Sequence, residues 1–147
     1  MAGPRAYPAT PVLAVSAAII RDGKVLLVRR ARPPASGVYT LPGGGVEVGE
    51  TLLEAVVREV REETALTVEP VALAGYREVI ARDCDGRVER HFVILPFAAR
   101  WIAGELMLND ELSEAKWIDP LEIAGLTTTV GLAEIITNAK ALLIGTR

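Results

Sequence analysis

Three glutamates, Glu59, Glu62 and Glu63, are spaced to lie together on one side of a helix. At about 100° per residue, their side chains fall within an arc of about 100° that begins at the border of the apolar stripe. Like charges at these spacings repel, and the helix dipole favours cations in this half of the helix. Carboxylate oxygens are the ligands that Mg²⁺ takes when it bridges a protein to substrate phosphates. The glutamates therefore indicate either a metal site or a solvated acidic face, and the helix alone does not decide between them.

The helix that carries these glutamates is predicted from about Leu52 to about Thr64. Thr51 and Glu54 have the spacing of a capping box, which marks a helix start. A buried stripe is predicted at Leu53, Val56, Val57 and Val60, which recur at helical spacing. On this helical wheel Arg58 falls on the opposite flank, as a solvent-exposed i, i+4 pair with Glu54.

The rest of the chain predicts a mixed sheet. Residue types that favour strands fill the runs Val12–Ile20, Val25–Val28, Val38–Leu41, Leu66–Ile80, Arg90–Ala99 and Glu114–Ile118. Asp22-Gly23 and Asp85-Gly86 are hairpin signals, and Gly43–Gly45 reads as a loop. Pro120 begins a possible helical turn, and Gly131–Ile144 has helical periodicity. The predicted class is α+β, with two main helices covering the sheet.

Composition predicts one domain over residues 1–147, with residues 1–10 as a flexible N-terminal segment. Of the 147 residues, 50% are hydrophobic and 24% charged, which suffices for an ordinary core. The net charge of −3 argues against binding a nucleic acid polymer.

The cysteine content and the residues at the start of the chain indicate the cellular compartment in which the protein is expected. Cys84 is the single cysteine, which excludes a disulfide framework and a cysteine-based zinc site and suits a reducing environment. The apolar stretch Pro11–Ile20 is too short to span a bilayer, and the preceding residues lack the features of a signal peptide. We expect a cytoplasmic protein without membrane association.

The spacing around the acidic helix resembles the Nudix box of the Nudix hydrolases. Gly44 is followed after five residues by Glu50, after seven more by Arg58–Glu63, and after one more by Ala65-Leu66. Eight of the nine specified positions match, and the resemblance implies the Nudix fold, a mixed β-sheet sandwiched between helices (α/β/α). Ala65 stands where the family has glycine. Its left-handed conformation would cost about 1 kcal/mol, unless the helix continues a little further.

The resemblance implies a divalent metal, Mg²⁺ with Mn²⁺ as a substitute. Carried over residue by residue, Glu59 and Glu63 are expected to be direct metal ligands, and Glu62 to bind a second ion or its waters. The main-chain carbonyl of Gly43 is a further expected ligand, and Glu50 is placed among the metal-site residues as a support from the loop.

Further catalytic residues are expected around this centre. Arg58 is assigned to the catalytic set by the resemblance, as a group that orients the carboxylates, although the wheel places it on the Glu54 flank. The family's general base often comes from outside the box. In the acidic loop before Trp117, Glu111 is the first candidate and Glu114 the second, with a merely solvated loop as the alternative.

Substrate contacts are expected from the arginines and glycines that flank the box. Arg29 and Arg30 carry guanidinium groups suited to phosphates, although an arginine cluster at a strand end is also an ordinary surface feature. The backbone of Gly44 and Gly45 can approach another group closely.

The resemblance implies an enzyme that cleaves the diphosphate linkage of a small-molecule nucleotide. ADP-ribose or a similar nucleoside diphosphate derivative is the first expectation, and a (deoxy)nucleoside triphosphate is the second. A nucleotide-binding regulatory module without hydrolysis is the competing class, since fold alone does not establish function. Family members are often dimers, so a homodimer stays open beside a monomer.

Overall fold

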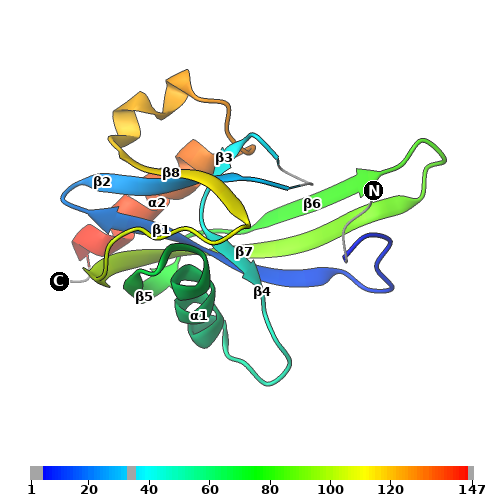
Figure 1. Cartoon of the computed structure of the whole chain (residues 1–147), viewed down its shortest axis with the longest axis horizontal. Helices are drawn as coiled ribbons and strands as arrows, with labels where there is room; N and C mark the ends of the chain where they lie inside the picture. Colours follow the sequence, from blue (N-terminus) through cyan, green and yellow to red (C-terminus); the bar gives the residue numbers. More distant parts are fainter. Residues whose placement is uncertain (1–4, 33–35, 146–147) are drawn as a thin grey trace.

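The strand and helix signals assemble into one forked mixed sheet with a helix on each face. The computed structural model describes residues 5–32 and 36–145 (Figure 1). The strands are β1 (Val12–Arg21), β2 (Lys24–Arg30), β3 (Tyr39–Thr40), β4 (Gly43–Gly45), β5 (Thr67–Leu73), β6 (Arg77–Arg82), β7 (Val88–Ala103) and β8 (Leu112–Ile118). The helices are α1 (Leu52–Thr64), the short 3₁₀ helix η1 (Pro120–Gly125) and α2 (Leu132–Gly145). The α+β class with a mixed sheet is thereby confirmed.

The fork in the sheet lies at β1. This strand runs parallel to β7 along nearly its whole length, and its second edge is shared between two antiparallel partners. β4 pairs with the first half of β1, whereas β2 pairs with its end across the predicted Asp22-Gly23 turn. β3 and β8 extend the sheet from β2, and β5 and β6 pair with successive parts of β7.

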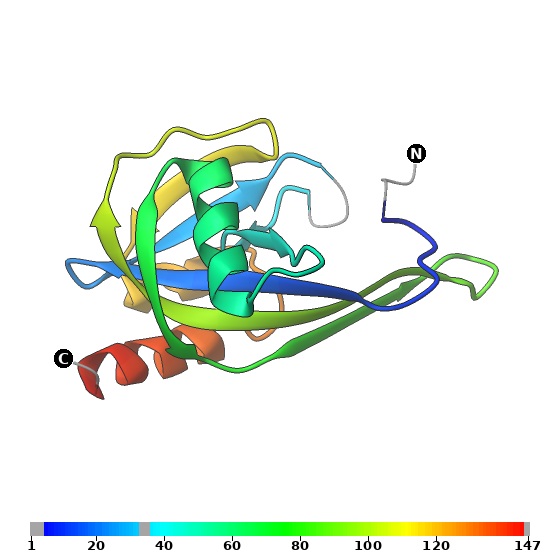
Figure 2. The same cartoon turned by 90° about the horizontal axis from the view of Figure 1, so that it is seen from below.

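Both faces of the sheet centre are buried. Val15, Ala17 and Ile19 of β1 pack in the cluster that contains Val56 and Val60 of α1. Ala18 and its neighbours on the other face pack against α2 (Figure 2). A sheet covered on both faces needs apolar residues in continuous runs rather than in alternation, which explains the composition of β1 and β2. Neither α1 nor α2, within the described residues, is long and apolar enough to cross a membrane.

Helix α1 begins and ends where the sequence predicts. Both hydrogen bonds of the capping box between Thr51 and Glu54 are present. Ala65 ends the helix with a φ of 66°, in the left-handed conformation usually taken by glycine, and its N–H donates to the Arg61 carbonyl. Of the two outcomes considered for Ala65, the structure therefore has the strained helix end.

The buried face of α1 is rotated relative to the predicted one. Val56 and Val60 are buried as predicted, but Leu53 is not. Leu53 is 49% exposed, whereas Ala55, Val56, Val60 and Glu63 are buried. The helix turns Glu63 toward the core because that carboxylate has partners there, which a wheel drawn from apolar residues alone does not register.

Two further expectations differ from the structure. Gly43–Gly45, read as a loop, is strand β4. The run Leu66–Ile80 is divided into β5 and β6 by Ala74–Tyr76, where Gly75 has a φ of 146°. The segment expected to be flexible, residues 1–10, lies partly outside the described residues. Within its described part, Tyr7 donates its hydroxyl hydrogen to Asp83 in the β6–β7 hairpin.

Candidate active site

Strand β4 brings the glycine backbone directly against the acidic helix. A Cβ atom at Gly43 would collide with the Val15 carbonyl of β1, and one at Gly44 would collide with the Glu59 carboxylate. The clash at Gly43 is with backbone, so glycine is required there, whereas a side chain at Gly44 would displace the Glu59 carboxylate. The sequence predicts that the backbone of the glycine run approaches another group closely. At Gly44 that group is the Glu59 carboxylate of the protein itself.

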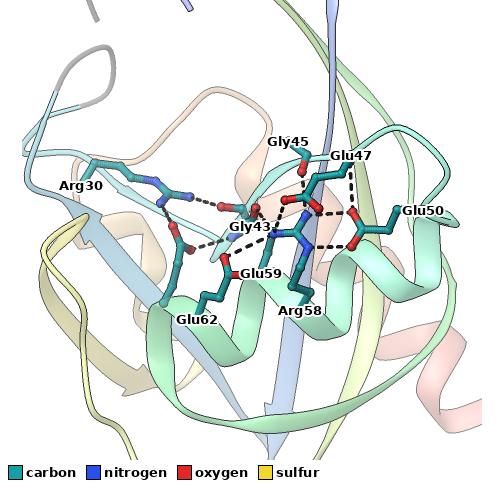
Figure 3. Close-up of polar contacts among 9 residues, drawn as sticks. Arg30, Gly43, Gly45, Glu47, Glu50, Arg58, Glu59 and Glu62 are labelled. Carbon is teal, nitrogen blue, oxygen red and sulfur yellow. Dashed lines mark hydrogen bonds and ion pairs between the residues drawn. The ribbon is translucent and has the colours of Figure 1, made fainter. Parts of the chain in front are cut away.

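Arg58 lies at the centre of the acidic residues (Figure 3). Its Nε and Nη2 donate to the two oxygens of Glu50 at 2.6 and 2.8 Å, and its Nη1 donates to Glu59 at 2.8 Å and Glu62 at 3.3 Å. Nη2 also donates to the Gly45 carbonyl at 3.0 Å. The helical-wheel placement of Arg58 beside Glu54 is therefore wrong, because its guanidinium faces the carboxylates and joins α1 to β4.

Glu50 is held by Arg58 rather than directed at the cavity. The hydrogen bonds from Arg58 and from the Glu47 N–H lower the pKa of Glu50 to about 2. The hydrogen bonds from Arg58 to Glu50 and to Glu59 raise the pKa of Arg58. Both Glu50 oxygens are already engaged by this guanidinium, so the geometry does not support its assignment as a metal ligand and favours a supporting role.

Glu63 is enclosed where α1, β2 and β4 meet. It is 4% exposed, accepts the Gly43 N–H at 3.0 Å through Oε1 and accepts Arg30 Nη1 through Oε2. Arg30 Nη2 donates in turn to the Gly43 carbonyl at 3.2 Å. Burial raises the pKa of Glu63 despite the opposing charge of Arg30.

One cavity of about 700 Å³ opens at this centre and continues across the sheet toward β6 and α2. The predicted site residues that line it are Arg30, Gly43, Gly44, Gly45, Glu59, Glu62, Glu63 and Glu111. Glu50, Arg58 and Arg29 are not part of its lining. The structure thus brings together most residues expected from the acidic helix and separates the supporting ones from the cavity.

The donor atoms at the catalytic end suit a hard divalent cation. The Gly43 carbonyl and the carboxylates of Glu59, Glu62 and Glu63 supply oxygen alone, which is the ligand set of Mg²⁺ and Mn²⁺. Within residues 5–32 and 36–145 no three acidic, histidine or cysteine side chains converge into one metal-binding group. These carboxylates are instead paired with arginines, Glu63 with Arg30, and Glu59 and Glu62 with Arg58.

The two adjacent arginines of β2 have different surroundings. Successive side chains of a strand point to opposite faces, so Arg30 reaches Glu63 while Arg29 lies with Glu114 at 3.5 Å. Glu114 also accepts the Tyr39 hydroxyl at 2.8 Å. Arg29 therefore does not face the cavity as a phosphate-binding residue would, and Glu114 lies outside the cavity that Glu111 lines.

Three cavity-lining arginines were missed by the sequence interpretation. Arg5 lies over Gly45, and Arg77 and Arg90 come from β6 and β7. Arg77 and Arg90 each interrupt the apolar residues on one face of a strand, a period-two signal that was available in the sequence.

Comparison with known proteins agrees with this geometry. A family model described as the NUDIX domain matches residues 10–138. The ADP-ribose pyrophosphatase of Methanocaldococcus jannaschii is 41% identical over 109 residues, 74% of this chain and 62% of that protein. The nucleoside triphosphatase NudI of Salmonella agona is 36% identical over 113 residues, 72% of this chain and 80% of that protein.

Solved structures show the same fold. A MutT NUDIX hydrolase from Burkholderia pseudomallei superimposes with a TM-score of 0.76 at 28% identity, covering 88% of this chain and 98% of that one. Because the family model covers most of the chain and the acidic helix, glycine strand and cavity have the arrangement described above, this protein belongs to the NUDIX domain family.

Proposed function

We propose that this protein is a metal-dependent pyrophosphohydrolase that cleaves the diphosphate linkage of a nucleoside diphosphate derivative, with ADP-ribose as the first substrate. The observation that carries the proposal is that four oxygen-donor residues, Gly43, Glu59, Glu62 and Glu63, line one cavity. The relative named an ADP-ribose pyrophosphatase, 41% identical, supports the choice of substrate. This chain spans 62% of that relative's length.

The four oxygen-donor residues would hold Mg²⁺, or Mn²⁺ in its place. When bound, such an ion neutralises phosphate oxygens and activates a water molecule. The chain's own contribution is position: Arg58 fixes Glu59 and Glu62 against β4, and Glu50 fixes Arg58 through two hydrogen bonds. Partners of this kind orient ligands without contacting the ion.

Arg30 and Glu111 supply two further functions in the cavity. Arg30 shares its guanidinium between Glu63 and the Gly43 carbonyl, and it lines the cavity where a phosphate can take over part of its hydrogen bonding. Glu111 is exposed in the loop before β8 and is the candidate to accept a proton from the attacking water.

A nucleoside triphosphate is the second candidate substrate. The similarity to the nucleoside triphosphatase NudI favours it specifically. A nucleotide-binding module without hydrolysis fits less well, because all the carboxylates expected at the centre are present and three of them line the cavity.

The experiment is a substrate panel with the purified full chain. ADP-ribose, nucleotide sugars, diadenosine polyphosphates and the eight common nucleoside triphosphates are each incubated with Mg²⁺, with Mn²⁺ and with a chelator. The proposal expects AMP and ribose 5-phosphate from ADP-ribose only when a divalent ion is present. Turnover of triphosphates alone would select the second candidate, and binding without turnover of any compound would support the regulatory module.

We propose a single domain over residues 1–147 that acts in the cytoplasm on small nucleotides. A homodimer stays a prediction, which light scattering coupled to size-exclusion chromatography tests directly.

A further inference from the structure

The end of the cavity farthest from α1 contains two arginines that have no carboxylate partner in the described part of the chain. Arg77 pairs with Ile94 in the sheet, and Arg90 pairs with Ala81, so both side chains lie on the face that lines the cavity. Arg90 is only 6% exposed. Neither side chain makes a hydrogen bond or ion pair with another residue in the described part of the chain.

The nitrogens of these two side chains open onto the cavity. Among the described residues, Arg29 Nε is the buried side-chain nitrogen that lacks both a partner and contact with solvent. Arg77 and Arg90 are not in that condition, and they line the cavity, so the cavity is where their nitrogens can meet a ligand. Burial lowers the pKa of Arg77.

The sheet register separates these arginines from the catalytic carboxylates. Gly45 pairs with Ala14, Ala14 with Ile94, and Ile94 with Arg77, so three strand spacings lie between Gly45 and Arg77. At about 4.8 Å per spacing that is about 14 Å. Arg90 lies four residues from Ile94, about 13 Å along β7 at the usual rise per residue. A single diphosphate held at the glutamates does not span this separation.

The surface between the two arginines is apolar. Val79 pairs with Phe92 midway between them, and Ile94 continues the same face toward Ile135 of α2. Ile94, which lies between Gly45 and Arg77 in the sheet register, gives an apolar surface that suits the nucleoside and leaves the space between the two arginines free. A nucleotide whose diphosphate lies at Gly43–Gly45 would then have its nucleoside directed toward β6 and β7, the strands that extend from the body of the protein (Figure 1).

We propose that Arg77 and Arg90 form an anion subsite that binds an additional phosphate carried by the nucleoside portion of the substrate. The inference rests on the proposed function, because it uses that function to orient the substrate. A guanidinium stays charged in proteins, and a buried charge without a partner is unfavourable. The described residues supply no carboxylate to either side chain, so the missing anion belongs to the ligand. Arginine is well suited to a phosphate because it can donate two parallel hydrogen bonds to it.

The test compares ADP-ribose with 2′-phospho-ADP-ribose, which carries a phosphate on the adenosine ribose. In the wild type, kcat/KM should be about tenfold higher for the phosphorylated compound, the effect of one charge-assisted contact. Arg77→Gln and Arg90→Gln should each reduce that ratio to near one. Arg82→Gln is the matched control, since Arg82 is exposed on the same strand and bonds to the Gly86 carbonyl. It should leave the ratio unchanged.

Calorimetry with adenosine 2′,5′-bisphosphate and AMP separates this inference from the proposed function. If ADP-ribose is hydrolysed but the substrate ratio and the two affinities do not depend on Arg77 or Arg90, the subsite is refuted and the hydrolase stands. If nothing is hydrolysed but the bisphosphate binds about tenfold more tightly than AMP through these arginines, the subsite stands and the hydrolase fails. An equal loss for both substrates would place the arginines on the scissile diphosphate and overturn the subsite.

The melting temperature without ligand gives a second readout. Arg90→Met removes a buried cation that has no partner among residues 5–32 and 36–145, so the variant should melt at or above the wild-type temperature. A lower melting temperature together with an unchanged substrate ratio would assign Arg90 to the fold alone.

Discussion

Arginines beside the catalytic carboxylates and arginines at the opposite end of the cavity have different surroundings. At the α1 end, Arg58 and Arg30 are engaged by carboxylates and backbone carbonyls. At the β6–β7 end, Arg77 and Arg90 have no such partners within the described residues. The same side chain thus serves two purposes: a paired guanidinium positions protein groups, whereas an unpaired one is available to a ligand. Charge pairing, rather than proximity to the cavity, separates the two roles.

The largest expected effect comes from breaking the Arg58 network. Arg58→Gln should lower the free energy of unfolding by about 2 to 3 kcal/mol, because Glu50, Glu59 and the Gly45 carbonyl lose a charged donor. It should also lower kcat/KM by about 10- to 100-fold, the usual effect of losing an orienting partner. Arg58→Lys keeps the charge but not the fork, so partial recovery is expected. Chemical denaturation and steady-state kinetics measure both effects. A fully stable, fully active Arg58→Gln would contradict the positioning role.

The second prediction uses the neighbouring arginines of β2. Arg30→Gln should reduce kcat/KM by at least about tenfold, because Glu63 and the Gly43 carbonyl both lose their contact with it. Arg29→Gln should change it by less than about threefold, since Arg29 is on the other face with Glu114 and surface pairs contribute little. Steady-state kinetics on the two variants decides. Equal losses of kcat/KM in the two variants would show that Arg29 and Arg30 do not have different roles on the two faces of β2.

The third prediction concerns the pH dependence of stability through Glu50. Its pKa is lowered from 4.5 to about 2 by the hydrogen bonds from Arg58. A carboxyl whose pKa is lowered by folding stabilises the protein above its unfolded pKa, and that contribution disappears as the pH falls through the folded value. The difference in melting temperature between wild type and Glu50→Gln should therefore be constant above pH 4.5 and shrink toward pH 2. A difference that does not vary between these two pH values would show that Arg58 does not hold this carboxylate.

The smallest expected effect concerns the end of α1 at Ala65 and not the charged side chains of the helix. Ala65→Gly should raise the free energy of unfolding by roughly 0.5 to 1 kcal/mol, because the helix ends in a left-handed conformation at φ 66°. Differential scanning calorimetry should show an increase of about 2 to 4 °C per kcal/mol. Activity should stay within twofold. A destabilised variant would mean that the alanine methyl group packs usefully at the helix end.

Local signals in the sequence were sufficient for some elements and not for others. The start of α1 was predictable because the capping box of Thr51 and Glu54 is local. Strand β4 was not, because three glycines have no side chains and hence no alternation to read. Its strand geometry comes from pairing with β1, a partner distant in the sequence.

The same distinction applies to the site. The carboxylates of the acidic helix were predictable from spacing within one helix. The burial of Glu63 in place of Leu53 was not predictable, because it depends on the contact of Glu63 with Arg30 from another element. Arg77 and Arg90 each interrupt an apolar strand face in a way that the sequence shows, but the pairing of β6 with β7 that places both on one cavity could not be predicted.

The most direct test of the central claim compares two glutamates of α1 that differ only in where they point. Glu59 lines the cavity, whereas Glu54 closes the capping box, a position that glutamine also fills. Mg²⁺-dependent release of AMP from ADP-ribose is measured for Glu59→Gln and Glu54→Gln. The account predicts a loss of roughly a thousandfold for Glu59→Gln, the scale expected when a preorganised electrostatic contact at the reacting centre is removed, and wild-type activity for Glu54→Gln. Full activity in Glu59→Gln would contradict it.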